Sequence, residues 1–272
     1  MINISVVLYN NPIEEIQDLL SSIFKKYHGC NVINKLYLID NSPSDTLRHF
    51  KDFSDKIFYY KSTSNLGYGA AHNIALKQSI ADGIMYHLVV NPDIKFNEDV
   101  LNKISNYMDD NLDVGLLMPK VYYPDGSIQK LCRLLPDPVY LLMRRVLGSN
   151  FADKIFPKNN LESFDYNKLA NVPCLSGCFM FLRVSSLNDV GMFDDRFFMY
   201  LEDFDLVRRI HAKYKTIYYP YISVYHDFKK GSFGFNRLFY HHVISAVKYY
   251  NKHGWFFDEE RSKFNQNFLK SI

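Results

Sequence analysis

Three acidic residues lie in a stretch of the sequence that is otherwise apolar and aromatic. Glu202, Asp203 and Asp205 fall within residues 199–210. At helical spacing Asp203 shares a face with Leu206, so its carboxylate is expected to point toward the protein body. A buried carboxylate is costly unless it is hydrogen-bonded, paired or used in chemistry. The pattern therefore indicates either a general base or acids that stabilise the N-terminus of a helix.

Polar residues also follow two expected strands. Asp40 ends one of them, where a carboxylate can accept a hydrogen bond from a base N–H or a ribose hydroxyl; a plain Asx turn is the alternative. Asn91 and Asp93 follow the most apolar strand. A carboxylate in that place can hold Mg²⁺ or Mn²⁺ together with a substrate diphosphate, although a turn explains the same residues.

A histidine ends a later strand and is followed by basic residues. His226 precedes Lys229 and Lys230, and cationic side chains suit a diphosphate. A single histidine is more often structural than a metal ligand. The basic neighbours nevertheless favour a metal or phosphate site at His226.

The elements that must position these residues alternate between strands and helices. Expected strands are residues 3–9, 35–40, 56–60 and 85–90, and expected helices are 12–24, 45–53 and 69–81. This alternation predicts an α/β fold with a doubly wound, mostly parallel sheet. In such sheets ligands bind beyond the carboxyl ends of the strands. The polar residues above occupy those positions.

The second half of the chain is less regular. We expect a strand and turn at 119–125, an apolar and basic stretch at 133–148, a polar loop at 150–171, a buried run at 175–182, a strand at 216–225 and an aromatic, basic helix at 236–250. The resulting division is one domain of residues 1–235 followed by a C-terminal helical extension of residues 236–272.

Composition excludes several classes of protein. A net charge of +3 over 272 residues is too small to indicate a nucleic-acid partner. The four cysteines lack metal-site spacing and are expected to be reduced and buried. We expect no leader peptide and no membrane-spanning segment, and therefore a cytoplasmic protein.

The first strand and its turn argue against two nucleotide-binding classes. A dinucleotide-binding dehydrogenase needs a glycine-rich turn there, but residues 9–12 read Tyr-Asn-Asn-Pro. A nucleotidyltransferase needs a glycine-rich and basic loop in the same place. The glycines at Gly67 and Gly69 follow the third strand and fit an ordinary tight turn. A protein that binds a sugar nucleotide without catalysis, or that serves as a scaffold, remains a third alternative.

The sequence resembles the family 2 glycosyltransferases of the GT-A fold, in particular the rhamnosyltransferase-like bacterial branch. The resemblance rests on an ordered set of segments that runs from residue 3 to about residue 235. These segments are 5–10 (SVVLYN), 38–42 (LIDNS), 65–73 (NLGYGAAHN), 90–94 (VNPDI), 175–180 (LSGCFM) and 197–209 (FFMYLEDFDLVRR). The resemblance implies a Rossmann-like sheet of GT-A type with flanking helices.

The same resemblance implies a nucleoside-diphosphate sugar as donor. Tyr9 and Asp40 would then lie near the base and ribose, while Asn65 and Gly67 would shape the nucleotide pocket. Asn91 would also contact the nucleotide sugar.

A metal site follows from the resemblance as well. Asp93 matches the last acid of the family's D-x-D motif, and His226 matches a late histidine that can complete a site for Mg²⁺ or Mn²⁺. Asn91 stands where that motif usually begins with Asp, so one carboxylate fewer is present and a strict metal requirement stays open.

The acids of residues 199–210 also acquire roles from the resemblance. Asp203 corresponds to the catalytic base of the family's E-D motif, and Glu202 to its neighbour on the acceptor side. Asp205 is left as a partner of Arg208 or Arg209. The implied reaction is a single inverting displacement by an acceptor hydroxyl.

The predicted function is an inverting glycosyltransferase that builds a lipid-linked cell-surface polysaccharide, with rhamnose suggested by the branch. Basic and apolar residues lie side by side in two segments and suggest peripheral contact with the inner face of the plasma membrane; a subunit interface or ordinary core is the alternative. These residues are Arg133, Leu141, Leu142, Met143, Arg144 and Arg145, and Tyr240, His241, Lys248, Tyr249 and Tyr250.

Overall fold

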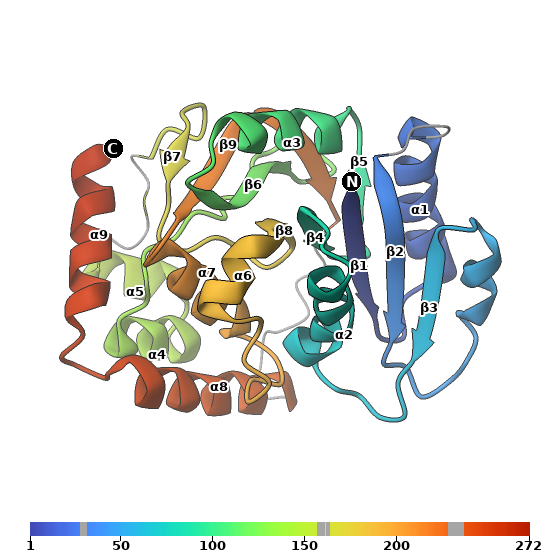
Figure 1. The fold of residues 1–272 in the computed structure, drawn as a ribbon. Helices are drawn as coiled ribbons and strands as arrows, with labels where there is room; N and C mark the ends of the chain where they lie inside the picture. The colour runs from blue at the N-terminus through green and yellow to red at the C-terminus, as the bar shows by residue number, and fades with distance from the viewer. Residues whose placement is uncertain (28–31, 157–160, 162–163, 228–236) are drawn as a thin grey trace.

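A central β-sheet organises the protein. The computed structural model describes residues 1–27, 32–156, 161, 164–227 and 237–272, and within them the strands form one sheet of nine (Figure 1). The strands are β1 (Ile2–Leu8), β2 (Ile33–Asp40), β3 (Ile57–Lys61), β4 (Tyr86–Val90), β5 (Ile94–Phe96), β6 (Val114–Tyr122), β7 (Ala170–Asn171), β8 (Phe179–Arg183) and β9 (Lys215–His226). Their order is β3-β2-β1-β4-β8-β6-β9-β5, and β7 pairs with β9.

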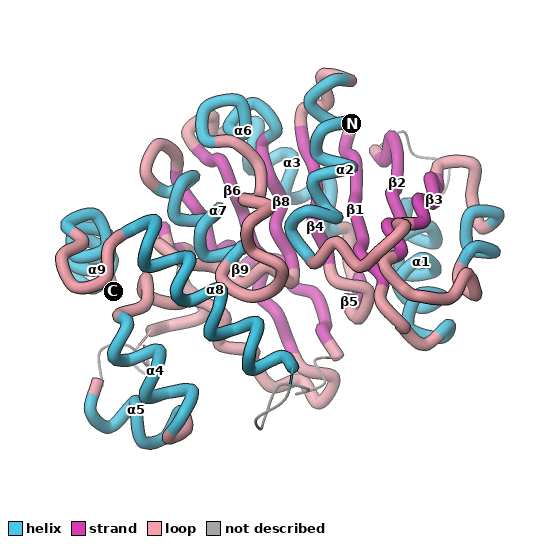
Figure 2. The backbone as a smooth tube through the Cα atoms, turned by 90° about the horizontal axis from the view of Figure 1, so that it is seen from below, coloured by secondary structure: helices cyan, strands magenta, loops and turns pink. Residues whose placement is uncertain are grey.

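Helices cover both faces of this sheet. They are α1 (Ile13–Tyr27), α2 (Tyr68–Ala81), α3 (Val100–Asp110), α4 (Pro138–Val146), α5 (Ser149–Ile155), α6 (Val184–Val190), α7 (Glu202–His211), α8 (Arg237–His253), α9 (Glu259–Ser271) and the 3₁₀ helix η1 (Arg48–Asp52). The two views together show α2 and α6 on one face and α1 on the other (Figures 1 and 2). α7 is a neighbour of both α2 and α6.

The direction of the strands marks the edge of the sheet at which a ligand-binding crevice is expected. β3, β2, β1 and β4 run parallel, and the chain order reverses at β1, which lies between β2 and β4. Ligands bind at such a switch point, beyond the carboxyl ends of the strands. β8 runs antiparallel to β4, with Val90 opposite Phe179, so the segment before β8 arrives at this same edge.

A buried chain of polar side chains links β1, β4 and α2. The Ser5 hydroxyl lies 2.7 Å from Nδ1 of His72 and 2.8 Å from Nε2 of His87. Nδ1 of His87 lies 2.7 Å from the hydroxyl of Ser79. All four side chains are fully buried. Because a buried polar group must find its partner, these bonds fix the position of α2, whose first residue lies at the crevice.

The C-terminal helices are tied to the rest of the protein. Arg208 of α7 donates two hydrogen bonds to Asp258, the N-cap of α9, and both side chains are buried. Asn265 exchanges hydrogen bonds with the backbone of Leu135, and Phe268 belongs to the main hydrophobic core. The division into residues 1–235 and an extension of residues 236–272 stays a prediction.

Most predicted elements are present with shifted ends, and two are wrong in part. The expected polar loop at 150–171 contains most of α5, which packs on α4, and the short strand β7; residues 157–160 and 162–163 lie outside the described part. The helix expected at 45–53 is only the 3₁₀ helix η1, and residues 46 and 47 before it form a turn.

One strand is longer than its sequence suggests. β6 begins at Val114, not at Pro119, and the proline lies inside it. The strand tolerates a residue without an N–H because its pairing with β8 ends at Leu117 and its register with β9 shifts after Pro119. The helix α3 carried no signal that we identified in the sequence.

Acid should destabilise the fold through His87. Burial lowers the pKa of His87 from 6.5 to about 3, so the unfolded chain takes up this proton more readily than the folded chain. The stability it provides is complete above about pH 6.5 and is lost as the pH falls toward 3. His87→Gln should reduce the slope of unfolding free energy against pH by up to about 1.4 kcal/mol per pH unit in that window. Urea denaturation at several pH values measures this slope, and equal slopes would contradict the prediction.

Candidate active site

The residues predicted to bind the nucleotide lie at one edge of the sheet. Tyr9 follows β1, Asp40 ends β2 and Asn91 follows β4, and these three strands are parallel neighbours. The backbone N–H of Asn91 donates to the carbonyl of Cys178 at 3.0 Å, which joins the segment before β8 to this edge. The predicted positions are therefore brought together as the strand order requires.

The acid pair starts α7 and contacts the same segment. One carboxylate oxygen of Asp203 accepts a hydrogen bond from the N–H of Gly177 at 2.9 Å, and the other accepts from the N–H of Phe204 at 2.9 Å. A Cβ atom on Gly177 would lie 3.0 Å from the Cβ of Asp203. Glycine at this position thus permits the close approach that holds the carboxylate.

Burial shifts the proton affinity of both acids. It raises the pKa of Asp203 above its usual value, although the N–H groups of Gly177 and Phe204 partly oppose the shift. Burial and the nearby charge of Asp203 raise the pKa of Glu202 strongly. Oε2 of Glu202 is buried and has no hydrogen-bond partner among the described residues. The pair therefore combines an oriented carboxylate with a neighbour that favours its neutral form.

The backbone before this pair is strained. Tyr200 and Leu201 both have positive φ, 69° and 64°. Left-handed conformation costs a residue with a side chain about 1–2 kcal/mol. Helix α8 supports the segment: the Ser245 hydroxyl donates to the carbonyl of Met199 at 2.8 Å, and Leu201 packs in a cluster with Tyr249. Strain of this kind is often found at functional sites.

Tyr68 connects the acids to the strand edge, and our reading of the sequence did not assign it a role. Its hydroxyl lies 2.7 Å from the carbonyl of Gly177 and 3.1 Å from Oδ1 of Asn91, both as acceptors. Burial raises its pKa well above the usual value. The only sequence signal was its place between Gly67 and Gly69. The side-chain amide of Asn91 therefore also has a structural role, since it contacts Tyr68.

Asp93 and His226 form a pair that suits a divalent cation. Oδ1 of Asp93 lies 3.1 Å from Nε2 of His226, while Nδ1 of His226 lies 2.9 Å from the side-chain oxygen of Gln129. Neighbouring ligands in an octahedral site lie about 3.0 Å apart, since each is about 2.1 Å from the metal. The bond to Gln129 orients the ring in the way typical of metal-bound histidines.

This pair supplies only two ligands. Burial alone would lower the pKa of His226, but hydrogen bonds to Asp93 and Cys178 outweigh it and raise the pKa to about 10, so a divalent cation would have to displace a proton from the ring to bind there. Within the described residues no three His, Cys, Asp or Glu side chains converge as a complete metal site. Other ligands would have to come from a diphosphate or water, which is usual for Mg²⁺. Lys229 and Lys230, the expected phosphate partners, lie outside the described residues.

The residues expected to shape the nucleotide pocket meet at Gly67. The side-chain oxygen of Asn65 accepts from the N–H of Gly67 at 2.9 Å, and the side chain of Asn41 donates to its carbonyl at 3.1 Å. Gly67 has φ of +85°, and a Cβ atom there would lie 2.1 Å from the carbonyl oxygen of Phe198. Only glycine fits this turn, which starts α2 and places Tyr68.

Asp40 is more enclosed than its predicted role suggests. Its carboxylate accepts from the N–H of Ser42 at 2.8 Å and from the hydroxyl of Tyr59, and lies 3.5 Å from Nζ of Lys61. The side chain is fully buried, whereas Tyr9 is half exposed. The bond to Ser42 is the Asx turn that the sequence offered as the alternative. Contact with a base would require Tyr59 to move, and the role of Asp40 stays a prediction.

Asp205 is a structural residue, as expected, but with different partners in part. It is fully buried and pairs with Arg209 at 2.8 Å, Lys252 at 2.7 Å and His253 at 2.7 Å. Burial alone would raise the pKa of Asp205, but the hydrogen bond to His253 and the charges of Arg209 and Lys252 lower it. The alternative partner Arg208 instead pairs with Asp258, the N-cap of α9.

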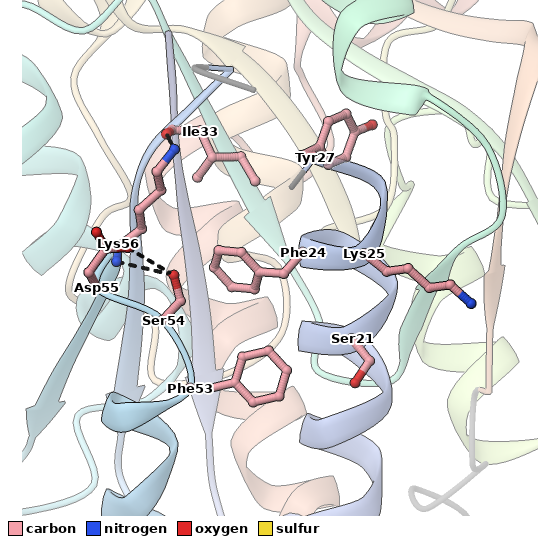
Figure 3. Close-up of a pocket in the computed structure, with 9 residues that line it drawn as sticks. All are labelled: Ser21, Phe24, Lys25, Tyr27, Ile33, Phe53, Ser54, Asp55 and Lys56. Atoms are coloured by element: carbon pink, nitrogen blue, oxygen red, sulfur yellow. Dashed lines mark hydrogen bonds between the residues drawn. The ribbon is translucent and has the colours of Figure 1, made fainter. Parts of the chain in front are cut away.

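A separate hollow lies away from these residues. Its cavity of about 500 Å³ is lined by α1 and by residues near the starts of β2 and β3, among them Phe24, Tyr27 and Phe53 (Figure 3). It is therefore at the amino-terminal edge of the parallel strands. None of the predicted site residues lines it.

Comparison with known proteins identifies the family. The sequence model of "Glycosyl transferase family 2" matches residues 4–191, which is more than half of the chain. The chain belongs to glycosyl transferase family 2. This confirms the family and the enzyme class that the ordered segments predicted.

Two curated relatives, both named as glycosyltransferases, also match the sequence. A protein of Mycobacterium tuberculosis named N-acetylglucosaminyl-diphospho-decaprenol L-rhamnosyltransferase is 29% identical over 71% of this chain and 66% of its own length. The low-salt glycan biosynthesis hexosyltransferase Agl10 of Haloferax volcanii is 24% identical over 76% of this chain and 61% of its own. The chain thus spans slightly less than two thirds of these relatives.

Solved structures confirm the GT-A fold class. TarS 1-349 of S. aureus in complex with UDP has a TM-score of 0.59 at 17% identity, covering 98% of this chain and 70% of that one. GalNAc-T7 with UDP, GalNAc and Mn²⁺ has a TM-score of 0.65 at 11% identity, covering 98% and 55%. At such identities the likeness concerns the fold alone.

Other expectations concern cysteines and membranes. Cys132, Cys174 and Cys178 are buried and unpaired, as expected, and Cys30 lies outside the described residues. In the described part of the chain, no helix has both the length and the apolar character needed to cross a membrane.

Replacing Gly67 should cost more stability than replacing another glycine with positive φ. Gly83 has φ of +62° and no atom within 4 Å of an added Cβ, so Gly83→Ala should lose only the backbone cost of about 1–2 kcal/mol. Gly67→Ala adds the clash with Phe198 and should lose more. Urea unfolding of both variants gives the comparison. Equal losses would show that the turn at Gly67 has room for a side chain.

Proposed function

We propose that this family 2 glycosyltransferase transfers a sugar, with inversion, from a nucleoside-diphosphate sugar to a hydroxyl group of a lipid-linked glycan. The observation that carries the proposal is the carboxylate of Asp203, fixed by two backbone N–H groups at the edge where Asn91 and Asp93 emerge. Rhamnose as the sugar is supported by the name of the mycobacterial relative, which also specifies a diphospho-decaprenol acceptor for that protein.

In the proposed reaction Asp203 acts as the general base. It takes the proton of the acceptor hydroxyl while that oxygen forms a bond to the anomeric carbon. The bond from this carbon to the diphosphate breaks, and the nucleoside diphosphate leaves with the electron pair. A raised pKa suits this role, since it makes the carboxylate a stronger base. Mg²⁺ or Mn²⁺ held by Asp93 and His226 would offset charge on the departing diphosphate.

Glu202 is proposed to bind the acceptor. Among the described residues its buried Oε2 has no hydrogen-bond partner, and its raised pKa favours a neutral carboxylic acid. A neutral acid can both donate and accept a hydrogen bond. Such a group can orient the acceptor hydroxyl toward Asp203 and satisfy its own buried oxygen once the acceptor is bound.

Asp203→Asn should abolish most of the transfer. Loss of a general base costs about 10²- to 10⁴-fold in rate, and we expect this in kcat with little change in donor binding. In the wild type, the rate should fall as the pH drops through the raised pKa of Asp203, because only the ionised form accepts a proton. Transfer assays against pH measure both effects.

Asp205→Asn is the matched control on the same helix. The change is chemically identical and lies two residues away, but Asp205 pairs with Arg209 and Lys252 and is not part of the proposed site. The folded fraction of this variant should retain the wild-type kcat. The substitution should lower the free energy of unfolding by about 3–5 kcal/mol, because it breaks a buried ion pair. Near wild-type transfer by Asp203→Asn would overturn the assignment of the base.

The metal pair predicts a cation-dependent affinity for nucleotide. UDP, which TarS and GalNAc-T7 contain in their solved structures, should raise the melting temperature more in the presence of Mn²⁺ than in its absence. Asp93→Asn should remove the additional increase, while Asp110→Asn, an exposed acid at the end of α3, should keep it. Calorimetric titration of Mn²⁺ in the presence of UDP provides the affinity directly. An unchanged Mn²⁺ affinity in Asp93→Asn would exclude the proposed ligand.

A further inference from the structure

Helices α4 and α5 expose an unusual surface. Seven described side chains between residues 139 and 156 are exposed, and six of them are large and apolar. We call these six the α4–α5 surface: Val139, Leu142, Val146, Leu147, Phe151 and Ile155. Their exposed fractions lie between 43% and 62%. A monomer in water rarely presents so many apolar side chains on two adjacent short helices.

The spacing places these side chains on continuous stripes. Val139, Leu142 and Val146 are three and four residues apart on α4, and Phe151 and Ile155 are four apart on α5, so each helix turns one apolar face outward. The two helices are neighbours and lie together at the lower left of Figure 2, at the end of the molecule away from β3.

The structure corrects the residues predicted to face a membrane. Tyr249 and Tyr250 of α8 are buried in the cluster that holds Leu201, and Leu141 and Met143 are half-buried. Leu142, Tyr240 and Lys248 are exposed as expected. Leu141 and Met143 flank Leu142 in the sequence, but on the helix α4 they point in other directions and are therefore less exposed.

We infer that the α4–α5 surface docks on the anionic face of a lipid bilayer. Helices of nine and seven residues are too short to span a bilayer, which needs about 20 residues, so they would lie in the interface with their apolar side chains among the lipids. This inference deepens the proposed function and rests on it, since a lipid-linked acceptor must be met at a membrane.

Charge distinguishes a bilayer from a second copy of the chain. Residues 138–155 contain Arg144, Arg145 and Lys154 but a single acid, Asp153, whose carboxylate accepts a hydrogen bond from Tyr140. A two-fold dimer through this surface would bring like charges together. An anionic lipid surface instead attracts these basic side chains.

The inner side of α4 is connected to the acid pair. Leu141 packs against the cluster of Phe197, Leu201 and Tyr250, and Leu201 is the residue before Glu202. The hydroxyl of Tyr250 donates to the carbonyl of Pro136, just before α4, at 3.3 Å. Docking through the outer side of α4 would therefore hold the bilayer at a fixed place relative to Asp203, where the glycan of a lipid-linked acceptor is needed.

Vesicle flotation with the full chain tests this surface. The wild type should float with vesicles of phosphatidylcholine and phosphatidylglycerol, and less with phosphatidylcholine alone or at high salt. The double variant Leu142→Ser, Phe151→Ser should bind at least about tenfold more weakly, because burying one such side chain is worth a factor of that order or more. Arg144→Gln with Lys154→Gln should remove the preference for the anionic lipid.

Met85→Ser with Leu112→Ser is the matched control. These apolar side chains are also exposed, by 55% and 74%, but they lie outside the α4–α5 surface, so this variant should float like the wild type. Absence of flotation by the wild type, or equal flotation by both serine variants, would overturn the inference. So would sedimentation showing a wild-type dimer that Leu142→Ser with Phe151→Ser dissociates, since a second copy would then cover the surface.

Nucleotide binding separates this inference from the proposed function. Thermal stabilisation by UDP and Mn²⁺ depends on the crevice and not on α4 or α5, so the Leu142→Ser, Phe151→Ser variant should retain it. Flotation without any nucleotide binding or transfer would leave the docking surface standing and reject the proposed activity. Transfer without flotation would support the proposed activity and reject the docking surface.

Discussion

The hydrogen bond from the N–H of Gly177 to Asp203 is the contact on which the arrangement of the site depends. It offsets part of the cost of burying a carboxylate, and it forms only because Gly177 has no side chain to hold α7 away. The carbonyl of the same glycine accepts from Tyr68, which also bonds to Asn91. A short series of hydrogen bonds thus connects the acid on α7 to the strand edge that carries Asp93.

The position of this glycine follows from the direction of β8. Because β8 is antiparallel to β4, its beginning lies beside the end of β4 and brings Gly177 to the crevice. The C-terminal helices complete the support. Helix α8 binds the segment that precedes the acids, where Tyr200 and Leu201 adopt left-handed conformations, and packing against Tyr249 helps to stabilise them. Contacts with α8 therefore help to hold the strained backbone that precedes Glu202 and Asp203.

Sequence reasoning located the parts of the site but not their bonds. Asp93 and His226 are 133 positions apart, yet both were found because each follows or ends an expected strand, and the sheet places them 3.1 Å apart. Tyr68 was missed because an aromatic residue beside glycines has no distinctive pattern. Asp40 was assigned from its position alone, and only the structure shows that Tyr59 and Ser42 already occupy its oxygens.

By itself the sequence determined the family, the α/β fold class and the strand ends at which chemistry could occur, because hydrophobic periodicity and local motifs are properties of short segments. Tertiary structure decided which side of each helix faces solvent. It turned Tyr249 and Tyr250 inward and left Leu142 and Phe151 outside. It also gave Asp205 two partners on α8, Lys252 and His253, beside the expected Arg209. These outcomes depend on contacts between residues far apart in the chain, whose geometry no local pattern contains.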